Sequence, residues 1–116
     1  MTFFLVVAPV QLTSAAPMED YYLTCYTPIE CPGEITYTGA NVREGIAATT
    51  EEHIGDCALI FTSDGEFLGY WEVLDKLGTG KKNVIDVWMP TMEKAVDMMA
   101  LTEGKVKVIF IEKPEG

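Results

Sequence analysis

Short runs of β-branched, aromatic and aliphatic residues recur along the chain, which is the pattern typical of β-strands. Glycine, proline and small polar residues separate these runs at positions that suit turns. The dipeptide Asp64-Gly65 between two apolar runs is a strong hairpin signal. We predict strands at Tyr21–Tyr26, Ile35–Thr38, Ala58–Thr62, Phe67–Leu74, Asn83–Met89 and Val106–Ile111.

One segment has the periodicity of a helix. After Pro90, apolar residues recur at helical spacing between Thr91 and Leu101. Thr91 is a candidate N-cap, and Gly104 follows the end of the pattern. We predict a helix whose methionines fill the core, with one apolar face made of Met92, Ala95, Val96, Met99 and Ala100.

The order of these elements favours one β-barrel domain. Six or so short strands with a single late helix fit a closed barrel better than an α/β sheet, in which strands and helices alternate. The chain has 116 residues, of which 48 % are hydrophobic, and this suits one domain with one core. We predict a single mainly β domain over residues 18–116, preceded by a separate segment over residues 1–17.

The first segment has two possible interpretations. The apolar run Phe3–Val10 and the small residues Thr13–Ala16 resemble the second half of a secretory signal, but no Lys or Arg occurs before Arg43. The alternative is a native first strand. The run is too short, and too clearly interrupted by Pro9, to cross a membrane. The signal-like interpretation predicts a secreted protein, and we expect no membrane span.

The charge argues against nucleic acid as a partner. The formal net charge is −10, which repels a phosphate backbone. A glycan remains compatible with this charge, because sugars are bound through hydrogen bonds and stacking.

The cysteines and the one histidine do not suggest a metal site. Cys25 and Cys31 flank a proline-containing loop and are spaced to form a disulfide if the protein is exported, whereas Cys57 resembles a small buried hydrophobic residue. No cysteines have the spacing of a zinc site. His53 lies in a polar turn and is expected to be an incidental surface residue. We predict no metal and no cofactor.

Two aspartates stand where carboxylates are unusual. Asp75 ends an apolar strand just before the glycine-rich stretch Gly78–Gly80, and Asp86 interrupts the apolar run Val84–Trp88. Burial and a neighbouring carboxylate both raise the pKa of such a group, which a general acid requires. The structural alternative is that Asp86 accepts hydrogen bonds from the amides of residues 78–80 and fixes that loop.

Several motifs occur in the order found in a known family. The segments Tyr26–Pro28, Ile35–Gly39 and Val42–Ala48 resemble the opening of the bacterial 3D (three-aspartate) domain, and the resemblance extends over about Tyr22–Glu112. The later motifs Ile54-Gly55, Leu74-Asp75, Val84-Ile85-Asp86-Val87 and Lys105–Val108 fall where that family has its Leu-Gly turn, its Asp-Thr-Gly loop, its Ile-Asp strand and its closing strand.

The resemblance implies a six-stranded double-psi β-barrel, related to membrane-bound lytic transglycosylase A and to barwin- and expansin-like barrels. It also implies cleavage of the peptidoglycan β-1,4 bond between N-acetylmuramic acid and N-acetylglucosamine, without a cofactor. By position, Asp86 matches the acid/base aspartate and Asp75 its neighbour in the loop. The matching substrate-binding positions are Tyr26, Thr38, Gly39, Thr49 and Gly78, with a packed core position as the alternative for Tyr26.

The sequence also departs from the family pattern. Thr49 stands where the family has its first aspartate, and Lys76 lies in the loop that follows Asp75. An inward-turned Lys76 ammonium would lower the pKa of either aspartate. The alternative functions are a non-catalytic, expansin-like binder of cell-wall glycan and a structural or phage-associated barrel. An aspartic protease is disfavoured, because the chain lacks the compact Asp-Thr-Gly turn and a second lobe.

Overall fold

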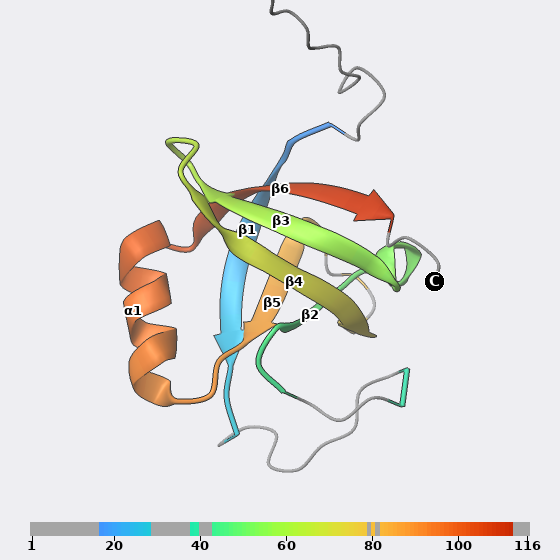
Figure 1. Cartoon of the computed structure of the whole chain (residues 1–116), viewed down its shortest axis with the longest axis horizontal. Helices are drawn as coiled ribbons and strands as arrows, with labels where there is room; N and C mark the ends of the chain where they lie inside the picture. The colour runs from blue at the N-terminus through green and yellow to red at the C-terminus, as the bar shows by residue number, and fades with distance from the viewer. Residues whose placement is uncertain (1–16, 29–37, 40–42, 79, 81, 113–116) are drawn as a thin grey trace, which may run out of the picture.

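The computed structural model of the chain is a closed β-barrel with one α-helix at its side (Figure 1). It describes residues 17–28, 38–39, 43–78, 80 and 82–112. The elements within these residues are β1 (Glu19–Tyr26), β2 (Ile46–Thr49), a 3₁₀ helix (Glu51–His53), β3 (Asp56–Thr62), β4 (Phe67–Lys76), β5 (Val84–Trp88), α1 (Met92–Thr102) and β6 (Lys105–Glu112).

The strands close into a ring in the order β1-β5-β2-β4-β3-β6. The pairs β1–β5 and β2–β4 are parallel, and the other four neighbouring pairs are antiparallel. Exchanging β1 with β4, β2 with β5 and β3 with β6 gives the same ring, read in the opposite direction. The barrel thus consists of two interlocked halves with the same connectivity, as expected of a double-psi barrel. The predicted fold class, a mainly β six-stranded barrel with one late helix, is confirmed.

Alternate strand residues point into the barrel and fill it. Residues paired across strands share a face, so that Leu23 lies beside Ile85 and Ala47 beside Val87 in the interior. Val73 and Val87 are fully buried in the same core. Because side chains fill the interior, a large ligand has to bind on the outer surface of the barrel or at its ends.

Five of the six predicted strands are confirmed, and β4 runs two residues further than predicted, through Asp75 and Lys76. Of the sixth, Ile35–Thr38, only Thr38 is described, and it lies in a turn. The structure adds β2, which the sequence analysis missed. All four residues of β2 are buried, so its sequence lacks the alternation that marks a half-exposed strand.

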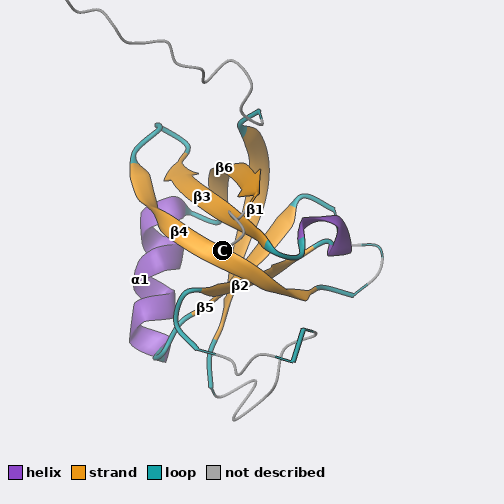
Figure 2. Cartoon of the chain, turned by 45° about the vertical axis from the view of Figure 1, so that its right-hand side comes forward, coloured by secondary structure: helices purple, strands orange, loops and turns teal. Residues whose placement is uncertain are grey.

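The predicted helix is confirmed, but its predicted buried face is only partly right. Thr91 is the N-cap, and its hydroxyl accepts a hydrogen bond from the backbone N–H of Lys94 at 3.1 Å. Figure 2 shows α1 along one side of the barrel. Only a narrow strip of the helix is covered, with Ala95 buried and Met99 packed against the core. Met92 and Val96 are therefore exposed rather than part of the core.

The predictions for the N-terminal segment and for one cysteine pair lie largely outside the described residues. These predictions concern residues 1–16 and Cys31. Cys25 and Cys57 are both half-buried, so Cys57 is less buried than predicted. Within the described parts of the chain, no helix has the length and apolar character needed to cross a bilayer.

Candidate functional site

The two predicted aspartates lie on either side of one residue of β2. Asp86 on β5 and Asp75 on β4 are both in register with Ala48. On the other side of Asp86, Thr24 of β1 continues the same row. At about 4.8 Å per strand, the Cα atoms of the two aspartates are about 10 Å apart. We call Thr24, Asp86, Ala48 and Asp75 the aspartate row.

The aspartate row lies on the outer face of the barrel. Ile85 and Val87, which flank Asp86 in sequence, are fully buried in the core, and alternation therefore turns Asp86 outward. Both aspartates are partly exposed, whereas Ala48 between them is buried. The structure thus brings the two predicted catalytic residues to the same side of the barrel.

A β-bulge turns Asp75 toward this face. Val73 pairs with Ala47 and points into the core, so strict alternation would also point Asp75 inward. The register between β2 and β4 shifts at Ala47/Ala48, and Leu74 becomes the extra residue. Bulges of this kind redirect side chains and are frequent beside active sites.

The Thr38–Gly39 turn is held at the same bulge. The backbone N–H and the hydroxyl of Thr38 both donate to the carbonyl oxygen of Leu74, at 3.3 Å and 3.0 Å. Gly39 has a φ of 91°, in the left-handed region that favours glycine. Both residues are exposed, and the hydrogen bonds to Leu74 place the turn beside Asp75.

The surroundings of the two carboxylates differ. The Oδ1 atom of Asp86 is shielded from solvent, while Oδ1 of Asp75 accepts a hydrogen bond from the backbone N–H of Lys76 at 3.0 Å. The Lys76 ammonium lies 3.6 Å from Glu51 of the 3₁₀ helix. Its charge is therefore shared with an acidic residue outside the aspartate row.

The pKa of Cys25 depends in part on the charge of Asp86. Burial raises the pKa of the Cys25 thiol to about 11, and the negative charge of Asp86 acts in the same direction. The thiol therefore stays protonated at neutral pH, and the Asp86 carboxylate is close enough to affect it. This proximity fits the register, because Thr24, the neighbour of Cys25, pairs with Asp86.

We expect Asp86→Asn to lower the pKa of Cys25 below about 11 in a chain whose other cysteines are replaced by serine. The substitution removes the smaller of the two causes, and burial keeps the value above the ordinary 9.0. The rate of Cys25 alkylation by iodoacetamide, followed against pH, measures this change without interference from the tyrosines. Asp64→Asn, in the β3–β4 turn, is the control. Superimposable titrations of the parent and Asp86→Asn would show that the two groups do not interact.

Two of the predicted substrate-binding residues are buried. Thr49 is 0 % exposed, and its hydroxyl donates to the carbonyl oxygen of Val84 at 2.8 Å. The Tyr26 ring is also buried, which agrees with the packed alternative. Neither side chain offers a surface to a sugar, because both contribute to the wall of the barrel. Gly78 is exposed in the stretch that follows Asp75 and β4.

The prediction that His53 is an incidental surface residue is wrong. Its ring stacks on Phe110 with centroids 3.6 Å apart, and its Nδ1 atom lies 3.1 Å from Oδ2 of Asp56. Only 18 % of the side chain is exposed. The short His53-x-x-Asp56 spacing across a turn is a sequence signal for this pair, but the contact with Phe110 depends on the pairing of β3 with β6.

His53 belongs to an acidic end of the barrel rather than to the aspartate row. Burial, followed by the charges of Glu19 and Glu52, raises the pKa of nearby Tyr21. Among the described residues, no three His, Cys, Asp or Glu side chains are grouped so that they could hold a metal ion.

Three hollows formed by described residues include part of β1, and two of them adjoin the end of the aspartate row. One, of about 590 Å³, lies between β1 and α1 and has Thr24 and Cys25 in its wall. The other, of about 280 Å³, lies where β1 meets β6 and includes Tyr22 and Lys105. Both hollows are on the exposed face of β1 that carries Thr24.

Comparisons with known proteins do not identify the chain. Neither the family models nor the curated proteins match its sequence. The case for a function therefore depends on the aspartate row and its surroundings.

Proposed function

We propose that the protein is a lytic transglycosylase, which cleaves the peptidoglycan β-1,4 bond between N-acetylmuramic acid and N-acetylglucosamine. The observation that carries the proposal is the aspartate row, in which two carboxylates face outward on either side of Ala48. A site on the outer surface suits a polymer, because a long glycan can lie across the strands without entering the filled barrel. The fold alone does not determine an activity, so the proposal depends on these side chains.

Asp86 is the acid and the base in this proposal. Its carboxyl donates a proton to the glycosidic oxygen while the bond to the muramoyl C1 breaks, and the N-acetylglucosamine hydroxyl leaves. The resulting carboxylate then accepts the proton of the muramoyl C6 hydroxyl as that oxygen bonds to C1. The product is a 1,6-anhydro ring, and no water is consumed. The shielded Oδ1 of Asp86 suits a proton transfer that excludes water.

Asp75 has a supporting role. Its carboxylate lies across the small Ala48 from Asp86, where a negative charge stabilises the positive charge that develops at C1. Thr38 and Gly39 border it and are candidates for hydrogen bonds to the sugar, as are Thr24 and Gly78. Thr49 and Tyr26 are not included, because their side chains are buried.

The alternative is a glycan-binding barrel without catalysis. The exposed rings of Tyr22 and Tyr70 favour it, since exposed aromatic rings stack on sugars without requiring an acid. The absence of an aspartate at Thr49 favours it as well.

Incubation of the protein with purified sacculi separates these functions. A lytic transglycosylase releases soluble anhydromuropeptides, which mass spectrometry identifies because they are lighter by one water than hydrolytic products. A binding barrel sediments with the sacculi in a saturable manner and releases nothing. Products with ordinary reducing ends would contradict the proposed ring closure and indicate a hydrolase instead.

A further inference from the structure

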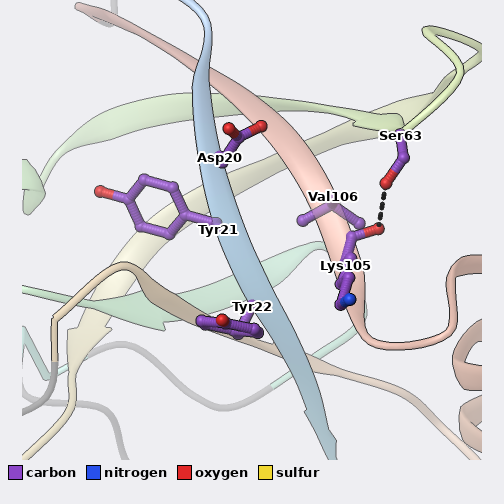
Figure 3. Close-up of a pocket in the computed structure, with 6 residues that line it drawn as sticks. All are labelled: Asp20, Tyr21, Tyr22, Ser63, Lys105 and Val106. Carbon is purple, nitrogen blue, oxygen red and sulfur yellow. Dashed lines mark hydrogen bonds between the residues drawn. The ribbon is translucent and has the colours of Figure 1, made fainter.

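A hollow beside the aspartate row combines an exposed aromatic ring with a cation. Tyr22 on β1 and Lys105 on β6 are directly paired across the two strands and lie on the same face (Figure 3). The Tyr22 residue is 60 % exposed. The hollow has a volume of about 280 Å³ and is lined by Asp20, Tyr21, Tyr22, Ser63, Lys105 and Val106.

The two lysines on this face differ in their partners. The ammonium of Lys107 lies 2.8 Å from Oδ1 of Asp20, so Lys107 already forms an ion pair within the chain. In the part of the chain that the structure describes, no acidic group lies within ion-pair distance of Lys105. In a chain of net charge −10, Lys105 therefore provides a local site for a negatively charged group.

The hollow lies close to Asp86. Tyr22 precedes Thr24 by two residues, and Thr24 is the neighbour of Asp86 on β5. With about 3.3 Å per residue along β1 and about 4.8 Å between strands, the Cα atoms of Tyr22 and Asp86 are about 8 Å apart. Tyr22 and Asp86 lie on the same outer face, so one glycan strand can contact both.

We propose that Tyr22 and Lys105 form a subsite for a sugar that carries a carboxylate. The Tyr22 ring stacks on the face of the sugar, and the Lys105 ammonium pairs with its carboxylate. The volume is just under the range of about 300–1,000 Å³ that is usual for drug-sized ligands, which fits one sugar ring better than a longer segment. The identity of the polymer rests on the proposed function. In peptidoglycan, the carboxylate belongs to the stem peptide or, where the peptide has been removed, to the lactyl group of muramic acid.

Binding to Asp86→Asn, which is expected not to consume the ligand, tests the subsite. We expect peptide-free tetrasaccharides of alternating N-acetylglucosamine and N-acetylmuramic acid to bind more tightly than neutral chitotetraose, as measured by NMR titration. Adding Lys105→Gln should weaken binding of the acidic glycan about tenfold, because a charge-assisted hydrogen bond is lost, and leave chitotetraose unaffected. Adding Tyr22→Ala should weaken binding of both roughly threefold to tenfold.

Matched controls are Lys94→Gln and Phe67→Ala. Lys94 is an exposed cation on α1 that does not line the hollow, and its ammonium lies 3.9 Å from Glu44. Phe67 is an exposed ring on β4, which lies opposite β1 in the ring of strands. Spectra of each variant without ligand establish that the barrel is folded. A Lys105 effect confined to muropeptides would assign the carboxylate to the stem peptide. Equal affinity in the Lys105→Gln and Lys94→Gln proteins for every glycan, with or without peptide, would overturn the subsite. Cleavage of sacculi by Asp86→Asn would instead overturn the proposed catalytic role, and the binding comparison would still stand.

Discussion

Replacing Asp86 by asparagine is expected to abolish the release of anhydromuropeptides from sacculi while the barrel remains folded. The side-chain amide has nearly the shape of the carboxyl group but cannot donate its proton to the glycosidic oxygen. General acid–base catalysis contributes about 100- to 10,000-fold to a rate, and we expect a loss of that size. Asp86 faces outward from β5, so the substitution leaves the apolar core intact. Initial rates of product release, measured by mass spectrometry, give the comparison.

Three further substitutions define the role of Asp86. Asp86→Glu keeps a carboxyl group on a longer side chain and should retain part of the activity. Asp75→Asn removes only the supporting charge and should cost roughly tenfold, the equivalent of about 1.4 kcal/mol. Asp64→Asn, in the exposed β3–β4 turn, should have no effect. If Asp86→Asn and Asp64→Asn release products equally fast, Asp86 is not the acid.

The strands and the helix were predictable because their signals are local. In Phe67–Leu74 and Val106–Ile111, the residue types alone identify a strand, and the helix at Thr91 carries its own cap. β2 could not be found in this way, because Ile46–Thr49 is buried throughout and has no alternation. Yet β2 is the strand that separates Asp75 from Asp86.

The candidate site was predictable in its residues but not in its geometry. The two aspartates were unusual in their apolar context, whereas their common alignment with Ala48 depends on strand pairing and on the bulge at Leu74. Tyr22 was missed for the same reason. Aromatic residues are common in strands, so only the pairing of Tyr22 with Lys105 on β6 marks it as a candidate binding residue. The burial of Thr49 is likewise a consequence of the three-dimensional arrangement.

Introducing the missing family aspartate by Thr49→Asp is expected to destabilise the protein rather than to improve its activity. Thr49 is fully buried, and its hydroxyl donates to the carbonyl oxygen of Val84 at 2.8 Å. An ionised carboxylate cannot donate this hydrogen bond and would place a negative charge against an oxygen atom. A buried charge without compensation costs about 3–5 kcal/mol. We expect the free energy of unfolding, measured by urea denaturation at pH 7, to fall by that amount.

The dependence on pH distinguishes buried charge from a simple packing defect. In the folded Thr49→Asp protein, burial raises the pKa of the new carboxyl above its unfolded value of about 3.9. The folded state then binds more protons than the unfolded state between these two pKa values, so stability relative to the parent falls as pH rises through that window. Below the unfolded pKa the protonated carboxyl can donate to Val84, and most of the penalty disappears. Thr49→Val, which only removes the hydroxyl, should lose about 1–3 kcal/mol without this added pH dependence. A Thr49→Asp protein as stable as its parent at pH 7 would mean that this position opens to solvent, where an aspartate could reach a sugar.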